Sequence, residues 1–481
     1  MKENSKNASY RHGILALKNQ FNYLTKSVAE AISGREQDYT SLPLGRAIFL
    51  LSLPMILEMT MESVFAVADI FFVSRLGAEA VATVGITESM MTIVYAIGFG
   101  LSIAASATVA RRIGEKDKRA ASNAAWQAII VSLMPSAIIS LVGIFFAPEL
   151  LAAMGASDMI VNEYSGYAAI MLGSNFVVML LFVINAIFRG AGDAAISMKV
   201  LWLANLLNIG LDPLLIFGWG PVPAMGVEGA AIATAIGRGV GVVLQLVILF
   251  RGSSRIQIFI SELKADLEIM GRIVKLSLGA VLQNIIATMS WVILVRIVAE
   301  FGSEAVAGYT ICIRILLFAL LPTAGLNNAA ATLVGQNLGA GRPDRAEQSV
   351  WMIARLDIIV MGLLGLGLFL GAERWVSFFI DNPRVIDIGS MLVRVISVGF
   401  ISYGVGMVMI NSINGAGDTI TPTRVNLLCF WAIEIPLAYA LAIWLGMEEI
   451  GVGLSIVIAE TILTLIAVGI FKKGKWKLSK V

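Results

Sequence analysis

Three carboxylic acids occur inside the first long hydrophobic segment of the chain, which otherwise has the composition of a membrane-spanning helix. They are Glu58, Glu62 and Asp69, and at about 100° per residue the second and third lie about 40° and 20° from the first around the helix axis. Ionisable side chains are costly inside a bilayer and usually have a function there. This acidic face predicts a site for a proton or a monovalent cation. The structural alternative pairs Glu58 and Glu62 with arginines such as Arg238 or Arg296.

A second polar group occurs in the hydrophobic segment 196–219, which contains Asn205, Asn208 and Asp212. Asn208 and Asp212 are four residues apart, so their oxygens project from the same side of a helix. Carboxylate and amide oxygens are hard ligands, and with Asp69 they predict a Na⁺ site. Alternatively, the two neighbouring carboxylates share a proton. A structural alternative is that Asp212, which precedes a proline, simply ends its helix.

The first hydrophobic segment also carries a proline and several methionines near its acids. Pro54 stands one turn before Glu58, where it removes a backbone hydrogen bond and permits a kink. Met59 lies beside the acids, with Met55 and Met61 nearby. Flexible methionines suit a wall that binds varied ligands, although ordinary packing also explains them.

Composition places the whole chain in a membrane. Hydrophobic residues form 58% of it, charged residues 14%, and mean hydropathy is +0.85. With a single histidine and two cysteines inside apolar blocks, the sequence predicts no His/Cys metal site, no cofactor and no enzyme. Blocks of about 20 apolar residues predict membrane-spanning helices. We expect twelve spans, at residues 44–73, 81–109, 124–146, 164–188, 196–219, 229–250, 273–298, 305–334, 350–370, 388–413, 422–445 and 451–471.

The chain contains an internal repeat with a shift of 225 residues. Four short matches keep this shift: residues 77–82 with 302–307, 109–114 with 334–339, 189–193 with 414–418, and 226–227 with 451–452. Each repeat holds six predicted spans, so both copies enter the membrane in the same direction. The predicted fold is an all-α membrane protein of twelve transmembrane helices, arranged as two parallel six-helix repeats around a central cleft.

The repeat also separates shared residues from specialised ones. Asp69, Asn208 and Asp212 have apolar counterparts in the second copy, at Leu294, Ile433 and Leu437. A residue needed by the common scaffold would occur in both copies, so these differences favour an ion site in the first. The second copy keeps a polar residue, Gln283, at one matching position and has an acid of its own, Glu434.

Lysine and arginine lie mainly in the breaks after the even-numbered spans, which predicts an inner-membrane protein with both termini in the cytoplasm. The leader contains a segment, 14–21, that forms either a short amphipathic helix or part of a mobile tail. The predicted organisation is a leader at 1–43, an N-terminal lobe at 44–252, a cytoplasmic linker at 253–272, a C-terminal lobe at 273–471 and a basic tail at 472–481.

Several of these features together resemble the multidrug and toxic compound extrusion (MATE) transporters. They are the six-plus-six repeat, the sequence Val-Ala-Asp-Ile-Phe-Phe-Val around Asp69, and Arg-Gly-Ala-Gly-Asp after the fourth span. The sequence Asn-Ile-Gly-Leu-Asp-Pro that begins at Asn208 resembles the DinF-like branch. In that branch the residues that match Asp69, Asn208, Asp212 and Thr234 form the cation-coupling site, and a proline like Pro54 bends the first helix.

The resemblance implies a secondary antiporter that exports organic, often cationic or amphipathic, compounds in exchange for H⁺ or Na⁺. We expect its substrate pathway to include Glu58, Glu62, Met59, Gln283 and Glu434. The expected partners are small organic substrates and the lipid bilayer, without nucleic acid, and the expected state is a monomer. The alternatives are a flippase for lipid-linked precursors from the same superfamily, and a membrane receptor or scaffold that transports nothing.

Overall fold

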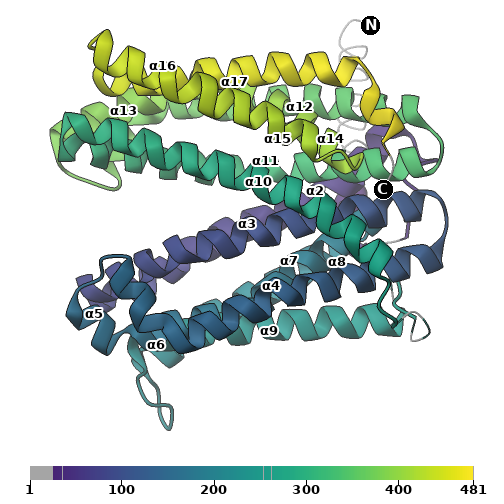
Figure 1. The fold of residues 1–481 in the computed structure, drawn as a ribbon, viewed down its shortest axis with the longest axis horizontal. Coiled ribbons are helices and arrows are strands. Elements are labelled where there is room, and N and C mark those ends of the chain that lie inside the picture. The colour runs from purple at the N-terminus through teal and green to yellow at the C-terminus, as the bar shows by residue number, and fades with distance from the viewer. Residues whose placement is uncertain (1–24, 35, 253, 260, 262, 480–481) are drawn as a thin grey trace, which may run out of the picture.

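The computed structural model describes residues 25–479 except 35, 253, 260 and 262, and long helices dominate it (Figure 1). Such helices satisfy their own backbone hydrogen bonds, as a chain inside a bilayer must. The segment 14–21, for which the sequence predicts an amphipathic helix or a mobile tail, lies outside the described residues. Residues 25–33 are helical and precede the first long helix.

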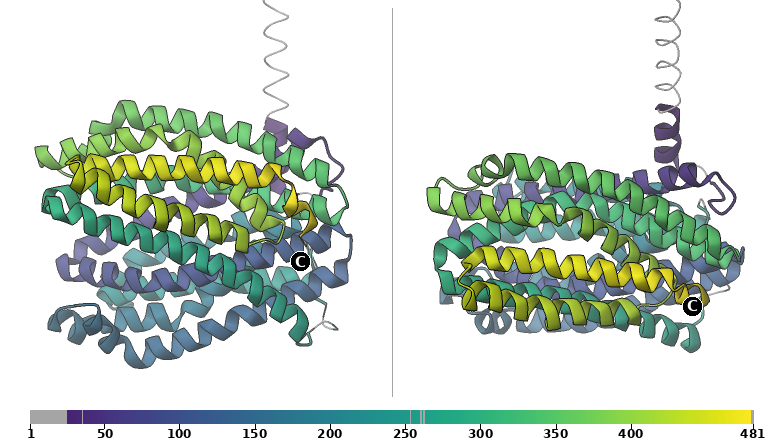
Figure 2. Two further views of the ribbon diagram at one scale, coloured as in Figure 1. Left: turned by 45° about the horizontal axis from the view of Figure 1, so that its top comes forward. Right: turned by 90° about the horizontal axis from the view of Figure 1, so that it is seen from above.

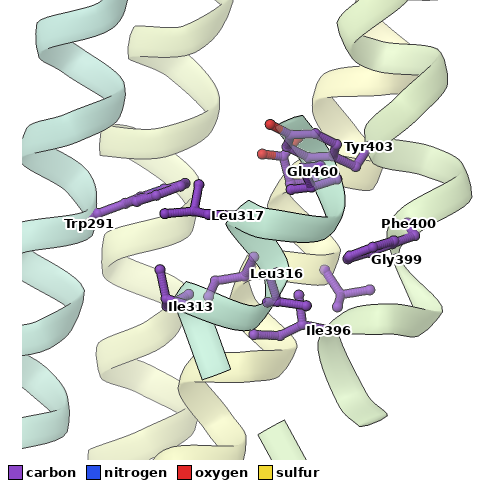
Figure 3. Close-up of a pocket in the computed structure, with 12 residues that line it drawn as sticks. Trp291, Ile313, Leu316, Leu317, Ile396, Gly399, Phe400, Tyr403 and Glu460 are labelled. Atoms are coloured by element: carbon purple, nitrogen blue, oxygen red, sulfur yellow. The ribbon is translucent and has the colours of Figure 1, made fainter. Parts of the chain in front are cut away.

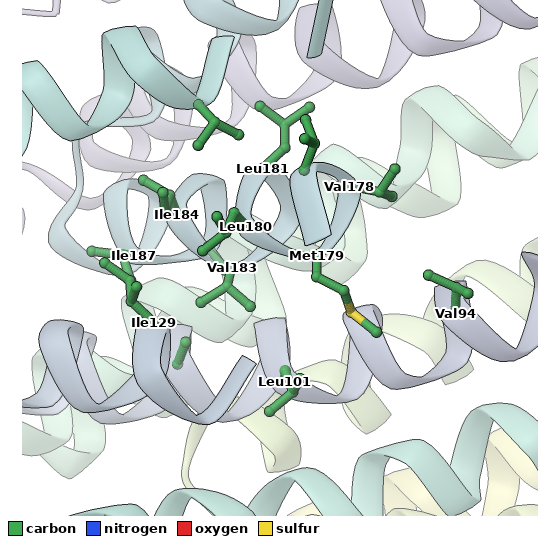
Figure 4. Packing of buried hydrophobic residues seen from close by; sticks show 14 of the residues in the cluster. Val94, Leu101, Ile129, Val178, Met179, Leu180, Leu181, Val183, Ile184 and Ile187 are labelled. Atoms are coloured by element: carbon green, nitrogen blue, oxygen red, sulfur yellow. The ribbon is translucent and has the colours of Figure 1, made fainter. Parts of the chain in front are cut away.

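The first half of the chain forms one group of helices, which we call the N-lobe. Its helices are α2 (Leu44–Val73), α3 (Ala78–Gly114), α4 (Lys118–Ala153), α5 (Asp158–Glu163), α6 (Ser165–Gly173), α7 (Asn175–Ala191), α8 (Ala194–Phe217) and α9 (Gly226–Arg251), with a 3₁₀ turn η1 (Ser74–Leu76) after α2. Figure 4 shows part of its core, where Val183 and Ile187 of α7 face the neighbouring helices that carry Leu101 and Ile129.

The second half forms the C-lobe. Its helices are α10 (Leu267–Val298), α11 (Ser303–Gly339), α12 (Pro343–Ser377), α13 (Pro383–Val398), α14 (Phe400–Gly415), α15 (Ile420–Asn426), α16 (Ile435–Tyr439) and α17 (Glu448–Lys472), with π-helical segments η4 (Leu427–Glu434) and η5 (Ala440–Trp444) and 3₁₀ turns η3 (Ala299–Phe301) and η6 (Lys475–Leu478). The left view of Figure 2 shows the same division, with the green and yellow C-lobe helices above the blue N-lobe helices.

Ten helices among the described residues are long and apolar enough to cross a membrane, and the number is eleven if the bent pair α13–α14 is counted as one span. The pair is bent by 54°. Helix α2, the predicted first span, is not in this set; it is 30 residues long and carries Arg46 and three acids. The structure therefore confirms an all-helical, multi-pass membrane architecture, while the count of twelve spans stays a prediction.

The repeat seen in the sequence reappears as paired contacts between the lobes. At Gly114 of α3, an added Cβ would lie 2.1 Å from the carbonyl oxygen of Gln336 on α11. At Gly339 of α11, an added Cβ would lie 2.1 Å from the carbonyl oxygen of Arg111 on α3. The shift of 225 residues exchanges these two contacts. The lobes are thus related by a pseudo-twofold axis that passes between α3 and α11.

A second pair of glycines repeats this relation further along the same helices. An added Cβ at Gly100 of α3 would lie 2.4 Å from the Cγ2 atom of Val281 on α10. An added Cβ at Gly325 of α11 would lie 2.5 Å from the backbone nitrogen of Ile56 on α2. The 225-residue shift exchanges these contacts too. Glycine is needed because the helices approach each other backbone to backbone.

The two lobes converge at one end of the bundle and diverge at the other (Figure 1). The end where α3 reaches Gly114 and α11 reaches Gly339 is called the closed end. Near it, every residue of α11 from 332 to 338 is buried. Toward the opposite end, Val64, Val67 and Phe71 of α2 are about half exposed, at 51%, 53% and 52%. The helices that line the interface therefore separate away from the closed end.

The segment before α2 joins the lobes at the closed end. The Tyr39 hydroxyl donates to the carbonyl of Gly192, in the turn between α7 and α8, at 3.2 Å. From the C-lobe, Arg345 donates to the carbonyl of Tyr39 at 3.1 Å, and Arg342 donates to the carbonyl of Thr40 at 2.6 Å. Burial raises the pKa of Tyr39 to about 12, so its hydroxyl keeps the proton that it donates. This segment ties α12 to the N-lobe.

Candidate functional site

Asp212 on α8 is fully buried, and neither of its carboxylate oxygens has a hydrogen-bond partner among the described residues. One turn earlier, Asn208 Nδ2 donates to Thr234 Oγ1 of α9 at 2.8 Å. The amide oxygen of Asn208 is also without a partner in the described chain. Gly237 of α9 permits this geometry, since a Cβ there would lie 2.7 Å from the carbonyl oxygen of Ala204. The packing of α8 on α9 thus leaves three buried oxygens unsatisfied.

The helix-end explanation for Asp212 is wrong. Helix α8 continues through Pro213 to Phe217, so Asp212 lies inside a helix rather than at its end. A proline inside a helix removes one backbone hydrogen bond, and α8 tolerates this loss near its last turn. Buried polar atoms are almost always hydrogen-bonded, so two unpartnered carboxylate oxygens call for a ligand or a proton.

Asp69 lies on the half of α2 that is further from the closed end, and it is partly buried. Its charge acts on Asp212 of α8, and the charge of Arg238 of α9 acts on Asp69. Within the described residues, Asp69 makes no ion pair. The structure therefore brings Asp69 close to Asp212, and Asn208 into contact with Thr234.

Arg238 is a buried base at the centre of the N-lobe. Its Nη2 atom lies 3.3 Å from Oε1 of Glu62, and Asn205 Nδ2 donates to the other oxygen of Glu62 at 3.1 Å. The guanidinium lies over the ring of Phe65, 5.4 Å from its centroid. Its Nε and Nη1 atoms have no partner among the described residues. Glu62 therefore has one of the arginine partners that the sequence suggested as an alternative.

Glu58 is also paired, but with an arginine that was not predicted. Arg189 Nη1 donates to Glu58 Oε1 at 2.7 Å, and Glu58 is fully buried. Arg189 belongs to the repeated Arg-Gly-Ala-Gly-Asp segment at the end of α7. The suggested Arg296 instead lies 2.6 Å from Glu300, one turn further along the chain. A buried pair of this kind fixes α2 against α7, so Glu58 has a clear structural role.

Three further residues of the N-lobe cluster were missed in the sequence. Tyr95 of α3 donates to Glu88 Oε2 at 3.5 Å, and the charge of Glu88 acts on Arg238. Tyr167 of α6 is buried where the charges of Asp69, Glu88 and Asp212 all act on it. Glu88 could have been found, because it is an acid inside a predicted span. Tyr95 and Tyr167 carry no such signal, since a lone tyrosine in an apolar segment is ordinary.

The other predicted residues lie at separate places. Pro54 is buried inside α2, which remains one unbroken helix, and Met59 is partly buried on the same helix. Gln283 of α10 accepts a hydrogen bond from Asn414 Nδ2 at 3.3 Å. Glu434 is buried in the C-lobe on η4 and belongs to no N-lobe contact in the described structure. The predicted substrate pathway thus includes residues of both lobes.

The N-lobe cluster is negative overall if its members are ionised. The charges of three acids, Glu62, Asp69 and Glu88, act on one base, Arg238, and the fourth acid, Asp212, lies near Asp69. No three His, Cys, Asp or Glu side chains of the described chain are grouped so that they could hold a metal ion. The predicted Na⁺ set, two carboxylates and one amide, is not a group of that kind, so it stays a prediction beside the proton alternative.

A duplicated bundle of apolar helices, divided into two lobes with an acidic cluster that includes the buried Asp212, is typical of a membrane transporter. The family profile described as MatE matches residues 54–214 and 280–440, one stretch in each lobe. The chain belongs to this family of multidrug and toxic compound extrusion transporters. Its relatives are transporters rather than enzymes.

Three curated relatives illustrate the likeness. The chain is 24% identical over 446 residues to the probable multidrug resistance protein NorM of Thermotoga maritima, which covers 90% of this chain and 93% of that protein. It is 28% identical over 404 residues to the FAD transporter of Shewanella oneidensis, covering 83% and 88%. It is 24% identical over 426 residues to the multidrug export protein MepA of Staphylococcus aureus, covering 88% and 93%.

Solved structures share the fold. A transporter of the MOP superfamily from Pyrococcus furiosus superposes with a TM-score of 0.86 at 24% identity, covering 92% of this chain and 98% of that one. A MATE family transporter in an outward-facing conformation superposes with a TM-score of 0.85 at 24% identity, again covering 92% and 98%. The two-lobe arrangement of this chain is therefore that of MATE transporters.

Proposed function

We propose that this protein is a secondary antiporter of the inner membrane, which exports organic cationic or amphipathic compounds in exchange for H⁺ or Na⁺. The coupling cation enters the N-lobe at Asp69, Asn208, Asp212 and Thr234. Both termini and the closed end face the cytoplasm, so the described conformation is open to the outside. The protein acts as a monomer without a cofactor.

One observation carries this proposal: Asp212 is fully buried with both carboxylate oxygens unpartnered. An ionised carboxylate in such a place is strongly disfavoured unless a cation or a proton compensates for the lost water. The nearby Asn208 oxygen is unpartnered as well and supplies another ligand atom. A site of this kind holds a small cation tightly in one conformation and releases it in another where water reaches it.

Helix α2 is the element that transmits cation binding to the rest of the molecule. It carries Asp69 at one end of the site, and it meets the C-lobe where Gly325 of α11 packs against Ile56. Pro54 lies two residues before this contact and lacks a backbone donor, so α2 bends more easily there. Neutralisation of Asp69 and Asp212 changes how α2 packs on α8. The cation and the substrate then favour different states, as exchange requires.

The charge of the N-lobe favours cationic or amphipathic substrates. The cluster contains four acids and a single arginine, Arg238, so it attracts cations when its acids are ionised. The names of the NorM and MepA relatives refer to multidrug resistance and multidrug export. The name of another relative refers to FAD, which is an anion. The unpartnered Nε and Nη1 atoms of Arg238 would serve such a substrate, so an anionic flavin nucleotide is the second candidate.

Transport by purified protein in proteoliposomes tests the proposal. We expect export of a lipophilic cation such as ethidium when either a pH gradient or a Na⁺ gradient is imposed alone, and the effective gradient identifies the coupling ion. Asp69→Asn and Asp212→Asn should abolish gradient-driven export while the protein still inserts into the membrane. The exposed acid Asp387 provides the matched control, and Asp387→Asn should export normally.

Two results would contradict the proposal. Gradient-driven export at the wild-type rate by Asp212→Asn would remove the N-lobe site from the mechanism. Movement of a fluorescent lipid-linked phosphate without any imposed cation gradient would indicate the flippase alternative. An absence of transport for organic cations, flavin nucleotides and lipids alike, in protein that is folded and inserted, would favour a receptor or scaffold.

A further inference from the structure

The segment just before α2 is held by both lobes at once. We call residues 38–42 the strap. In the strap, the Tyr39 hydroxyl donates to the carbonyl of Gly192 in the N-lobe at 3.2 Å. The backbone carbonyl of the same tyrosine accepts from Arg345 Nη2 of α12, in the C-lobe, at 3.1 Å. One residue, 5% exposed, therefore bonds to both lobes.

Two arginines at the start of α12 supply the hydrogen bonds from the C-lobe to the strap. Arg345 also donates to the carbonyl of Leu42, and Arg342 Nη1 donates to the carbonyl of Thr40 at 2.6 Å. The carbonyls of residues 39, 40 and 42 accept no backbone hydrogen bond within the described chain, and they are thus free for these donors. Hydrogen bonds from a charged donor are stronger than those between neutral groups. The two guanidinium groups therefore hold the strap firmly while they are in place.

The residues that precede the strap lie on the N-lobe. Lys199 Nζ of α8 donates to the carbonyl of Ser33 at 3.0 Å. An added Cβ at Gly34 would lie 2.9 Å from the Cβ atom of Ala195, also on α8. With the bond from Tyr39 to the turn before α8, these contacts follow the chain from residue 33 to residue 39. The strap therefore stays with the N-lobe when the lobes separate, and its bonds to the arginines break.

The repeat contains an equivalent of this contact in the linker before α10. Under the 225-residue shift, Tyr39 corresponds to Lys264. The carbonyl of Lys264 accepts from Gln127 Nε2 of α4 at 2.7 Å, and the backbone N–H of Asp266 donates to Gln127 Oε1 at 3.2 Å. In each copy, the residues before its first long helix are thus held by the third long helix of the other lobe. The linker is covalently continuous with both lobes, whereas the strap reaches the C-lobe through noncovalent contacts, which are reversible.

The arginines themselves are specific to the second copy. Arg342 and Arg345 correspond to Asp117 and Ala120 under the same shift. A residue needed by the common scaffold would occur in both copies. The two arginines are therefore a specialised feature of the C-lobe, directed at the strap.

We propose that the strap is a reversible lock, which stabilises the conformation closed at the cytoplasmic end and is released from Arg342 and Arg345 each time that end opens. A tyrosine cannot lengthen, so its bonds to Gly192 and Arg345 cannot both persist once the lobes move apart at this end. The strap thus opposes inward opening and favours the outward-open state. The inference rests on the proposed function, because it requires that the closed end opens during transport.

Distances between spin labels in lipid nanodiscs test the lock without any transport. Arg251 at the end of α9 and Lys473 after α17 are exposed, and labelled cysteines can replace them because the native cysteines are buried. Arg342→Ala/Arg345→Ala should raise the ratio of long to short distances by about 10- to 100-fold, since it removes three charge-assisted hydrogen bonds. Tyr39→Phe should leave this ratio near the wild-type value, because the bond that it removes is present in both conformations.

Two control variants separate the lock from a general change in the C-lobe. Arg355→Ala removes an exposed arginine further along α12. Ile396→Val removes one carbon from the wall of a cavity of about 50 Å³ that lies inside the C-lobe (Figure 3). Both should give the wild-type distances. Size-exclusion chromatography and circular dichroism establish that each variant is folded.

An unchanged distance distribution in the folded double arginine variant would overturn the proposal. So would an equal shift in either control variant, since the effect would not belong to the strap. A shift in Tyr39→Phe as large as that of the arginine variant would show release from the N-lobe and contradict the assignment to the arginines. A failure of coupling in the N-lobe would instead appear as export by Asp212→Asn and would leave these distances unaltered.

Discussion

The glycines at the closed end allow a direct test of how the lobes fit together. Gly114 and Gly339 each meet a backbone carbonyl of the other lobe, with an added Cβ only 2.1 Å from the carbonyl oxygen. Contacts under 3.0 Å are essentially unknown for Cβ atoms, so alanine at either position forces the lobes apart by about 1 Å. Each partner is backbone of a long helix and cannot rotate away. The double variant Gly114→Ala/Gly339→Ala should therefore disfavour the conformation that is closed at this end.

The size of the effect follows from the cost of overpacking. Forcing an extra carbon into a packed contact costs about 1–3 kcal/mol. Since about 1.4 kcal/mol is a tenfold change in an equilibrium constant, each alanine should shift the equilibrium away from the closed-end state by about 5- to 150-fold. Helix propensity works the other way and stabilises each helix by up to about 1 kcal/mol, without favouring either lobe arrangement.

Distances between spin labels measure this shift. Arg119 at the start of α4 and Asp344 at the start of α12 are exposed, are related by the repeat, and can each be replaced by a labelled cysteine, because the native cysteines are buried. Wild-type protein should give mainly the short distance, and the double variant a larger fraction of a longer one. Gly469→Ala, where an added Cβ meets nothing within 4 Å, should behave as wild type. An unchanged distance distribution in the folded double variant would refute the tight pseudo-twofold packing.

Two further predictions concern stability. Glu58→Ala leaves the mostly buried Arg189 without its partner, so we expect the free energy of unfolding to fall by about 3–5 kcal/mol, measured as a lower Tm by intrinsic fluorescence. The ion pair of Glu304 is exposed, so a decrease no greater than that caused by Glu304→Ala would contradict the buried pair. Asp193, in the turn between α7 and α8, has its pKa raised by burial to about 6. The pKa of an aspartate in the unfolded chain is about 3.9. The protonated Asp193 side chain therefore contributes up to about 3 kcal/mol to folding stability, which is complete below about pH 4 and is lost as the pH rises through about 6. The Tm of Asp193→Asn minus the Tm of wild type should therefore increase between pH 4 and 7. A Tm difference that stays constant across this range would contradict the assignment.

The sequence predicted the parts of the fold that depend on local composition and on the repeat. Apolar blocks predicted the long helices, and the 225-residue shift predicted two similar lobes. The shift also relates Gly114 to Gly339, although only the structure shows that these glycines touch the opposite lobe. The bend between α13 and α14 and the π-helical segments carry no comparable signal, because they depend on packing between helices.

The candidate site was partly predictable for the same reason. Spacing on one helix placed Glu58, Glu62 and Asp69 on one face, but it could not choose the arginine that each acid meets. Arg189 lies 131 residues from Glu58, and only the tertiary fold brings the two side chains together.

The most direct test of the account is to run the exchange backwards. Proteoliposomes with protein in a known orientation receive a gradient of an exported organic cation, with no initial gradient of H⁺ or Na⁺. Coupled antiport predicts that this gradient drives H⁺ or Na⁺ in the opposite direction, and that Asp212→Asn abolishes the opposing flux while Asp387→Asn retains it. Substrate movement that drives neither cation, or an undiminished opposing flux in Asp212→Asn, would contradict coupling at the N-lobe site.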